Sequence, residues 1–384
     1  MNKQYQLAEI NNSGKAYIIY KSRKGFNLYT DFSKKVILNN KNIEDFLKKK
    51  FKNKTKKTDL FIGFFGFELL NNLINVKIPK QKNINFPKGI FYKPEKIINL
   101  SNNLKYKSTS DVRNSDFKIN INKKSYTKIF NKFKKKIKSG ETYQIKICTK
   151  YKTKSKINPL DFFTRLSKTN LAPEAFMIKD KNYSIISCSP ENLITKKGSE
   201  ISTKPIAGTV KKTKSFNKIK ALNYFKKNIK ETKEHNMIVD MERNDLSRVC
   251  KIGSVKLSKQ KIVEEYKDLF HYVSLIKGKL KKDVKNIDII KAMMPGGSVI
   301  GCPKINTLNL LNNQEKENRN IYTGSFGYIK FNGDMRFNII IRSILNFKNF
   351  SEISVASGVV VDSNSSHEFN ENFIKAKALI DLFK

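Results

Sequence analysis

The sequence predicts a mixed α/β fold of the α+β kind. Two short apolar runs bounded by turn-forming residues, 15–20 and 59–67, are typical of strands. Apolar residues recur with helical periodicity at 126–137, and a second periodic segment lies at the C-terminus. Strands and helices that alternate in this way, without an internal repeat, are typical of α/β and α+β proteins.

The composition excludes several classes of protein. The chain has 384 residues, and 39% of them are hydrophobic, which is too many for a disordered chain and enough to bury a core. It contains no run of 18 apolar residues and no signal-peptide pattern, so we expect a cytoplasmic protein without a membrane partner. The four cysteines stand singly, which indicates reduced thiols, not disulfides or a zinc site.

The net charge of +44, from 77 basic and 33 acidic residues, is the strongest feature of the composition. Such a charge is typical of nucleic-acid-binding proteins. However, the excess is almost all lysine and is spread along the chain, whereas arginine, which reads phosphates and base edges, is scarce. The densest run, 48–57, has the pattern of a solvated helix end and loop. A basic nucleic-acid-binding protein is therefore a minor alternative.

The first hundred residues are β-rich, and the polar segment 100–117 is the best candidate for a boundary. We therefore expect an N-terminal β-rich part, 1–110, and a larger second part, 118–384. In the second part, a strand at 143–148 follows the helix 126–137. Its odd-numbered residues share one face, and the even-numbered ones, Gln144 and Lys146 among them, share the other.

Two further helices are predicted in the second half. One runs from about residue 217 to residue 245. The other is C-terminal and begins at a capping box of Ser365 and Glu368. The apolar stripe of this C-terminal helix consists of Phe369, Phe373, Ala376, Ile380 and Phe383.

The C-terminal helix places Glu368, Glu371 and Lys375 on one side, opposite the apolar stripe. Acids and a lysine at this spacing usually form a surface ion-pair ladder. The alternative is half of a Mg²⁺ site, because Mg²⁺ commonly takes one or two protein carboxylates beside water and an anionic substrate. A second acidic cluster surrounds Glu234 and His235. This pair lacks zinc-ligand spacing, so a charged helix face is the simplest interpretation.

The segment 295–304 is the strongest local signal. Gly296 and Gly301 have the spacing of a phosphate-binding P-loop, but Cys302 and Pro303 stand where Lys and Ser or Thr are required. The remaining possibilities are a structural turn and a turn whose backbone approaches a ligand and donates N–H groups to an anion. Elsewhere, His271 lies in an apolar stretch that suits either a buried core histidine or a catalytic one.

Taken in order, these segments resemble the motifs of the chorismate-utilising enzymes, which include the anthranilate, aminodeoxychorismate, isochorismate and salicylate synthases. The resemblance covers roughly two thirds of the chain, from Gly140 to the C-terminus. The matching segments are 140–150, 189–193, 205–209, 233–250, 295–304, 322–328 and 358–375, together with Arg342.

The resemblance implies an anthranilate-synthase-like fold, with two β-sheets packed as a sandwich and helices outside, in which 118–384 is the chorismate-binding catalytic domain. It implies Mg²⁺ held by Glu234 and Glu371, because a hard dication would orient the ring carboxylate of chorismate. Glu191 resembles a general acid, which needs a pKa raised by burial, and His271 matches an active-site histidine. Substrate contacts are implied for Gly208, Thr209, Ser298, Tyr322, Arg342, Ala356, Ser357, Gly358 and Lys375.

The choice within the family rests first on Gln144. Isochorismate and salicylate synthases carry a water-activating lysine base at this position, so its absence implies ammonia as the nucleophile, with Gln144 in the catalytic set. The forms Tyr143–Lys146, Gly296–Ser298 and Tyr322–Ser325 resemble aminodeoxychorismate synthase component I. That enzyme aminates chorismate to 4-amino-4-deoxychorismate for 4-aminobenzoate and folate synthesis. The Leu-Leu-Glu-Ser and Pro-Ser-Pro-Tyr feedback segments of anthranilate synthase are missing.

One residue favours the alternative. Ala207 stands where many aminodeoxychorismate synthases carry a nucleophilic lysine, and it is the anthranilate synthase residue. Anthranilate synthase component I, which forms anthranilate and pyruvate for tryptophan synthesis, is therefore the second hypothesis. A further departure is Ala356–Gly358, where the family usually has Gly-Ala-Gly. The resemblance also implies a separate glutamine amidotransferase subunit as the source of ammonia and a downstream aminodeoxychorismate lyase.

Overall fold

The computed structural model describes residues 3–22, 24–48, 56–79, 81–82, 84–101, 104, 106, 115–213, 215–266 and 269–384. Most of the lysine run 48–57 and most of the boundary segment 100–117 lie outside the described residues. Within the described part, no helix has the length and apolar character needed to cross a membrane.

The elements confirm the mixed α/β class. The strands are β1 Tyr17–Ser22, β2 Gly25–Ile37, β3 Leu60–Phe65, β4 Gly89–Leu100, β5 Lys118–Ile119, β6 Gln144–Lys154, β7 Glu174–Lys179, β8 Tyr183–Ser189, β9 Asn192–Lys197, β10 Glu200–Lys204, β11 Ile206–Lys211, β12 Lys256–Glu265, β13 Leu269–Lys279, β14 Gly301–Cys302, β15 Ser325–Lys330, β16 Met335–Ile339, β17 Ser343–Phe347 and β18 Phe350–Val359. The helices are α1 Lys3–Asn12, α2 Ile43–Leu47, α3 Phe67–Leu73, α4 Lys123–Lys138, α5 Pro159–Thr169, α6 Lys218–Lys227, α7 Ile229–Val249, α8 Asn286–Met293, α9 Lys304–Gln314 and α10 Ser365–Ile380, with 3₁₀ turns η1 Gly297–Val299 and η2 Asp381–Phe383.

The strands are joined by antiparallel pairings into one continuous network. It runs β6–β18–β17–β8–β7–β1–β2–β4–β3–β15–β16–β9–β10–β13, with β5 and β14 beside β6 and with β11 and β12 beside β13. The network folds over on itself, because Phe176 of β7 stacks on Phe326 of β15 with ring centroids 3.7 Å apart. The predicted sandwich therefore exists, but its two layers belong to one hydrogen-bonded sheet.

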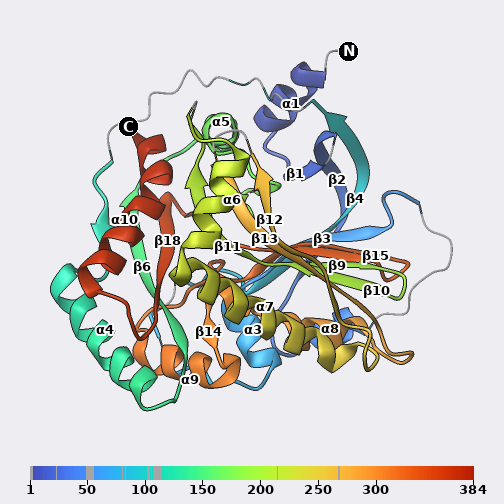
Figure 1. Ribbon diagram of the computed structural model, residues 1–384. Coiled ribbons are helices and arrows are strands. Elements are labelled where there is room, and N and C mark those ends of the chain that lie inside the picture. The colour runs from blue at the N-terminus through green and yellow to red at the C-terminus, as the bar shows by residue number, and fades with distance from the viewer. Residues whose placement is uncertain are drawn as a thin grey trace.

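Helices cover the outer faces of this folded sheet, as predicted (Figure 1). Helices α2, α3, α7 and α8 pack on β3, β4, β9 and β16, whereas α5 and α10 pack on β7, β8, β17 and β18. Helix α4 lies beside α10 over β6 and β18 (Figure 1). Strands β1 and β3 pair with β7 and β15, so the N-terminal strands are part of the same sheet. The division at residue 110 stays a prediction.

The helix and strand expected between residues 126 and 148 are confirmed as α4 and β6. Asn122 caps α4 by accepting a hydrogen bond from Ser125 N at 2.9 Å, and Phe130 and Phe133 of its apolar stripe are buried. The strand begins at Gln144, so Tyr143 lies before it and is 62% exposed. The strands expected at 15–20 and 59–67 correspond to β1 and β3.

The single helix predicted from about residue 217 to residue 245 is wrong, because two helices occupy this segment. Helix α6 ends before Asn228 and α7 begins after it. The side chain of Asn228 accepts a hydrogen bond from Glu231 N at 3.1 Å, so this residue caps α7. Helical periodicity continues across the break, whereas the cap depends on a single asparagine.

The C-terminal helix differs from its prediction in the face that it buries. Phe373, in the predicted apolar stripe, is 51% exposed, whereas Glu368 and Asn372 are buried. Asn372 donates a hydrogen bond to Thr149 Oγ1 of β6 at 3.0 Å. The helix is capped by Asn364, not by the predicted capping box. Part of the polar face of α10 is therefore turned towards the sheet, which places charged groups inside the protein.

Candidate functional site

A cavity of about 150 Å³ lies where β6, β18, α10 and the loops before β15 and β17 converge. Its wall consists of Lys146, Ser298, Val299, Tyr322, Ile341, Arg342, Ser354, Val355, Ala356 and Lys375. Five of the residues predicted to contact substrate are in this wall: Ser298, Tyr322, Arg342, Ala356 and Lys375. The fold thus brings together positions separated by many residues in the sequence.

Strand β6 directs two side chains towards one carboxylate. Gln144 Nε2 donates to Glu234 Oε1 at 2.9 Å, and Lys146 Nζ donates to the same oxygen at 3.1 Å. The backbone of Gly358 on β18 pairs with Lys146, and a Cβ there would lie 2.7 Å from Lys146 Nζ and 3.0 Å from Gln144 Nε2. Sequence reasoning assigned no role to Lys146, although its spacing from Gln144 places both on one face of the strand.

The ion pair between Lys146 and Glu234 is charged on both sides. The Lys146 ammonium is the main influence that holds the pKa of Glu234 at about 2. Burial by itself lowers the pKa of Lys146, but the carboxylates of Glu234, Glu371 and Glu368 outweigh it and raise that pKa. Lys146 is therefore an ammonium at neutral pH, and it connects the acids of α7 with those of α10.

Helix α10 contributes a second acid and a second lysine. Glu371 Oε1 lies 2.8 Å from Lys375 Nζ, which also donates to Ala356 O at 3.0 Å. Burial raises the pKa of Glu371, but the charge and hydrogen bond of Lys375, a hydrogen bond with Glu368 and the charge of Lys146 together outweigh it and lower that pKa. Ligand atoms of His367, Glu368 and Glu371 all lie within 4.8 Å of one another. The carboxylates of Glu368 and Glu371, with that of Glu234 on α7, offer the oxygen ligands that Mg²⁺ prefers, whereas His367 offers a ring nitrogen.

Glu191, which follows β8, is the predicted general acid and is 5% exposed. Within the described part of the chain, Glu191 Oε1 has no hydrogen bond of good geometry, although the Ser298 hydroxyl lies close enough to lower the pKa of Glu191. Burial raises the pKa of Glu191 to about 7, and the positive charges of Lys146 and Arg342 oppose this only in part. Burial therefore favours the protonated form of Glu191, as a proton donor requires.

Arg342 supplies an unpaired positive charge to the cavity. Its side chain makes no hydrogen bond or ion pair to any described residue, and burial lowers its pKa from the ordinary value. Its backbone has a φ of +50°, a left-handed conformation that is uncommon for arginine. A guanidinium that faces a cavity without a partner suits the bidentate recognition of a carboxylate.

Gly208, Thr209 and His271 form a separate group on β11 and β13, outside the cavity wall. Thr209 Oγ1 and His271 Nδ1 are 2.9 Å apart, and the two residues are register partners. Burial lowers the pKa of His271 to about 3, so its imidazole is neutral. His271 has the burial and hydrogen bond of a core histidine, and it can act only by hydrogen bonding at neutral pH.

Two further segments contribute backbone near the site. The side chain of Ser357 points away from the cavity, because its hydroxyl hydrogen-bonds Tyr126 OH at 2.5 Å. In the glycine-rich segment, a Cβ on Gly297 would lie 2.0 Å from Met241 Sδ, and one on Gly301 would lie 2.0 Å from Gln144 O. These two glycines are needed for close packing against the protein itself, which agrees with the structural turn, one of the two possibilities that the sequence left open.

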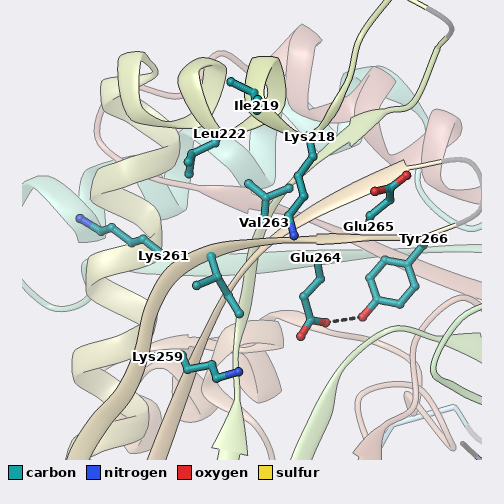
Figure 2. A pocket seen from close by; sticks show the side chains of 10 residues that line it. Lys218, Ile219, Leu222, Lys259, Lys261, Val263, Glu264, Glu265 and Tyr266 are labelled. Carbon is teal, nitrogen blue, oxygen red and sulfur yellow. Dashed lines mark hydrogen bonds between the residues drawn. The ribbon is translucent and has the colours of Figure 1, made fainter.

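A larger open groove of about 810 Å³ lies between α6 and β12 (Figure 2). Ile219 and Leu222 of α6 face Val263 of β12 across it, and Tyr266 donates a hydrogen bond to Glu264 at 2.6 Å (Figure 2). None of the residues that the sequence predicts to be catalytic, substrate-binding or metal-binding lines this groove. The candidate site is therefore the smaller cavity.

The cavity wall carries the cations of Lys146, Arg342 and Lys375, an arrangement that suits a small, negatively charged ligand. Two of these cations are paired with carboxylates, Lys146 with Glu234 and Lys375 with Glu371. A family model described as chorismate binding enzyme matches residues 8–381, and the chain belongs to this family. The motifs seen in the sequence are thus those of a chorismate-utilising enzyme.

Two named relatives divide between two activities. The chain is 36% identical over 255 residues to aminodeoxychorismate synthase component 1 of Bacillus subtilis, an alignment that covers 66% of this chain and 54% of that protein. It is 31% identical over 347 residues to an anthranilate synthase component I-like protein of Synechocystis, covering 83% and 72%. The chain thus spans about half the length of the Bacillus relative.

The fold is shared with a solved structure of the same family. Anthranilate synthase component I from Streptococcus pneumoniae superposes with a TM-score of 0.76 at 25% sequence identity, covering 95% of this chain and 90% of that one. This likeness confirms the anthranilate-synthase-like fold.

Proposed function

We propose that the protein is aminodeoxychorismate synthase component I, which aminates chorismate with ammonia. The observation that carries the proposal is the hydrogen bonding of Gln144 and the charge of Lys146, both on β6. Gln144 stands where a water-activating base is needed and is hydrogen-bonded to Glu234, and Lys146 is a charged ammonium paired with the same oxygen. Neither group can remove a proton from water, which favours ammonia, a nucleophile that needs no such base.

In the proposed reaction, Arg342, Lys375 and Tyr322 bind the carboxylates and the enolpyruvyl group of chorismate. Glu191 gives its proton to the C4 hydroxyl as the C4–O bond breaks, and water leaves. Ammonia forms the new C–N bond, and the proton that its nitrogen loses returns to the Glu191 carboxylate. The low exposure of Glu191 keeps it protonated for this step.

Mg²⁺ is the proposed cofactor, with Glu234 and Glu371 as the protein ligands and Glu368 beside them. When bound, the ion would neutralise and orient the ring carboxylate of chorismate. The donor set supports this assignment, because the carboxylates of Glu234 on α7 and of Glu371 and Glu368 on α10 all lie close enough to Lys146 to act on its charge.

The alternative product is anthranilate, which Ala207 favours. Its methyl group is buried beside Ile238 and Met241, so β11 places no amine at this position.

To distinguish the two products, the protein should be incubated with chorismate, Mg²⁺ and a high ammonium concentration. Product that yields 4-aminobenzoate only after a lyase is added is the expected result, whereas direct formation of fluorescent anthranilate would contradict it.

We further propose that a separate glutamine amidotransferase subunit supplies the ammonia and that an aminodeoxychorismate lyase uses the product. The name of the Bacillus relative, component 1, supports a second component. Free ammonium should therefore support turnover by this chain alone, whereas glutamine should support it only with the added subunit. Glutamine-dependent turnover by the purified chain would contradict this arrangement.

Replacing Arg342 by Ala should raise the KM for chorismate by about 10- to 100-fold, because a charge-assisted hydrogen bond contributes about 1.5–3 kcal/mol. The KM of Arg342→Lys should lie between those of the wild type and of Arg342→Ala, since lysine keeps the charge but loses the bidentate geometry. Steady-state kinetics at saturating ammonium measures both. An unchanged KM in Arg342→Ala would show that the guanidinium does not contact the substrate.

A further inference from the structure

Lys146 already occupies the position at which a cation would meet Glu234. Its Nζ is 3.1 Å from Glu234 Oε1, and the two side chains are only 13% and 27% exposed. The same oxygen accepts a hydrogen bond from Gln144, so two donors of the chain itself use it. An ion that binds this oxygen must therefore replace contacts that the protein makes on its own.

The protein provides space for this lysine. Gly358 faces Lys146 across the β6–β18 pairing, and any larger residue there would meet the ammonium and the Gln144 amide. Lys146 is part of the cavity wall, and besides Glu234 of α7 it feels the charges of Glu368 and Glu371 of α10. Glu371, the other proposed ligand, is likewise paired with a lysine, Lys375.

We propose that the Lys146 ammonium acts as a tethered cation that competes with the divalent ion for Glu234. This inference rests on the proposed metal site. A monovalent ammonium held close to a dication repels it strongly, because partly buried charges are poorly screened. Metal binding to the substrate-free protein is therefore weakened, and Lys146 must move from Glu234 when the ion enters.

The substrate has a defined place in this exchange. Chorismate carries carboxylates, and one of them offers the displaced ammonium a new partner within the cavity. Metal and substrate should consequently bind with positive coupling, and each should raise the affinity for the other by the same factor. Removal of the lysine charge should reduce this coupling.

The direct test measures the binding of Mn²⁺ alone, by electron paramagnetic resonance of the free ion, without turnover. Lys146→Met should bind Mn²⁺ at least about tenfold more tightly than the wild type. Lys146→Gln should also bind Mn²⁺ more tightly than the wild type. This second variant keeps the question answerable if Lys146→Met does not fold. Mn²⁺ binding in Lys146→Met that is equal to the wild type, weaker or absent would overturn the inference.

Lys152 offers a matched control. It lies on the same strand, is 21% exposed and pairs with Glu317, which is 24% exposed. Lys152→Met removes the same charge away from the cavity, so its Mn²⁺ affinity should stay within about twofold of the wild type, since distant surface charges are screened. An equal tightening in Lys152→Met would attribute the effect to net charge and overturn the inference.

Failure of the proposed function and failure of the Lys146 inference give different results. If the wild type forms no aminated product from chorismate, the proposed function fails whatever the Mn²⁺ affinities are. If product forms and Lys146→Met binds Mn²⁺ no more tightly, only the tethered cation is rejected. Loss of Mn²⁺ binding in the double variant Lys146→Met with Glu234→Gln is the expected confirmation that the tightened site contains Glu234.

Discussion

Glu191→Gln is expected to lower kcat by about 10²- to 10⁴-fold, the usual contribution of a positioned proton donor. The glutamine amide fills the same buried space but cannot donate the proton that the leaving hydroxyl needs. The variant should keep its fold, because glutamine has nearly the same shape as glutamate and its amide oxygen can still accept the backbone hydrogen bond of Ile206. Steady-state kinetics with chorismate and ammonium, together with a thermal melt, measures both effects.

The pH dependence gives an independent test of the same assignment. Burial raises the pKa of Glu191 to about 7, so the protonated form predominates below pH 7 and is lost as the pH rises through that value. The wild-type kcat/KM should therefore fall on the alkaline side of about pH 7, and this fall should be absent from the residual activity of Glu191→Gln. Glu265→Gln, at an exposed ion pair with Lys212, should behave as the wild type. A fully active Glu191→Gln enzyme would exclude Glu191 as the acid.

Glu234→Gln is expected to abolish the Mg²⁺ dependence of the reaction and to lower activity by more than about 100-fold, since even outer-shell partners of metal ligands are worth 10- to 100-fold. Glutamine keeps the size of the side chain but removes the negative charge. The rate should be titrated against Mg²⁺ concentration in the wild type and in the variant. Glu371→Gln should have the same effect.

Glu317→Gln is the matched control for this experiment. Like Glu234, Glu317 is about one quarter exposed and is paired with a lysine of β6, but its partner Lys152 lies outside the cavity wall, whereas Lys146 is part of it. Its Mg²⁺ response should equal that of the wild type. If Glu234→Gln also retains the wild-type Mg²⁺ response, the metal assignment is wrong.

Much of the site could be predicted because its residues stand in ordered sequence motifs. The motifs led to Ser298, Tyr322, Arg342 and Lys375, which the fold brings into one cavity. Periodicity also predicted α4 and β6, and apolar runs bounded by turn-forming residues predicted β1 and β3, of which β3 is buried along its whole length. The separation of α6 from α7 at Asn228 was not predicted. It depends on one asparagine side chain that caps α7, and a single cap is a weak signal in the sequence.

The remaining features depend on tertiary contacts that no local pattern records. Helix α10 exposes Phe373 and buries Glu368 because its polar face meets β6, β18 and the cavity, contrary to the rule that apolar faces turn inward. The role of Lys146 depends on Glu234, which lies 88 residues further along the chain. The unpaired state of Arg342 is likewise a property of the packed site.

The central claim is that this cavity joins ammonia, and not water, to chorismate. It is tested most directly by mass spectrometry of the product formed from chorismate, Mg²⁺ and ¹⁵N-labelled ammonium in ¹⁸O-labelled water. The expected product contains one ¹⁵N atom and no ¹⁸O, and it does not form when ammonium is omitted. A product that carries ¹⁸O and no ¹⁵N, formed equally well without ammonium, would contradict the claim.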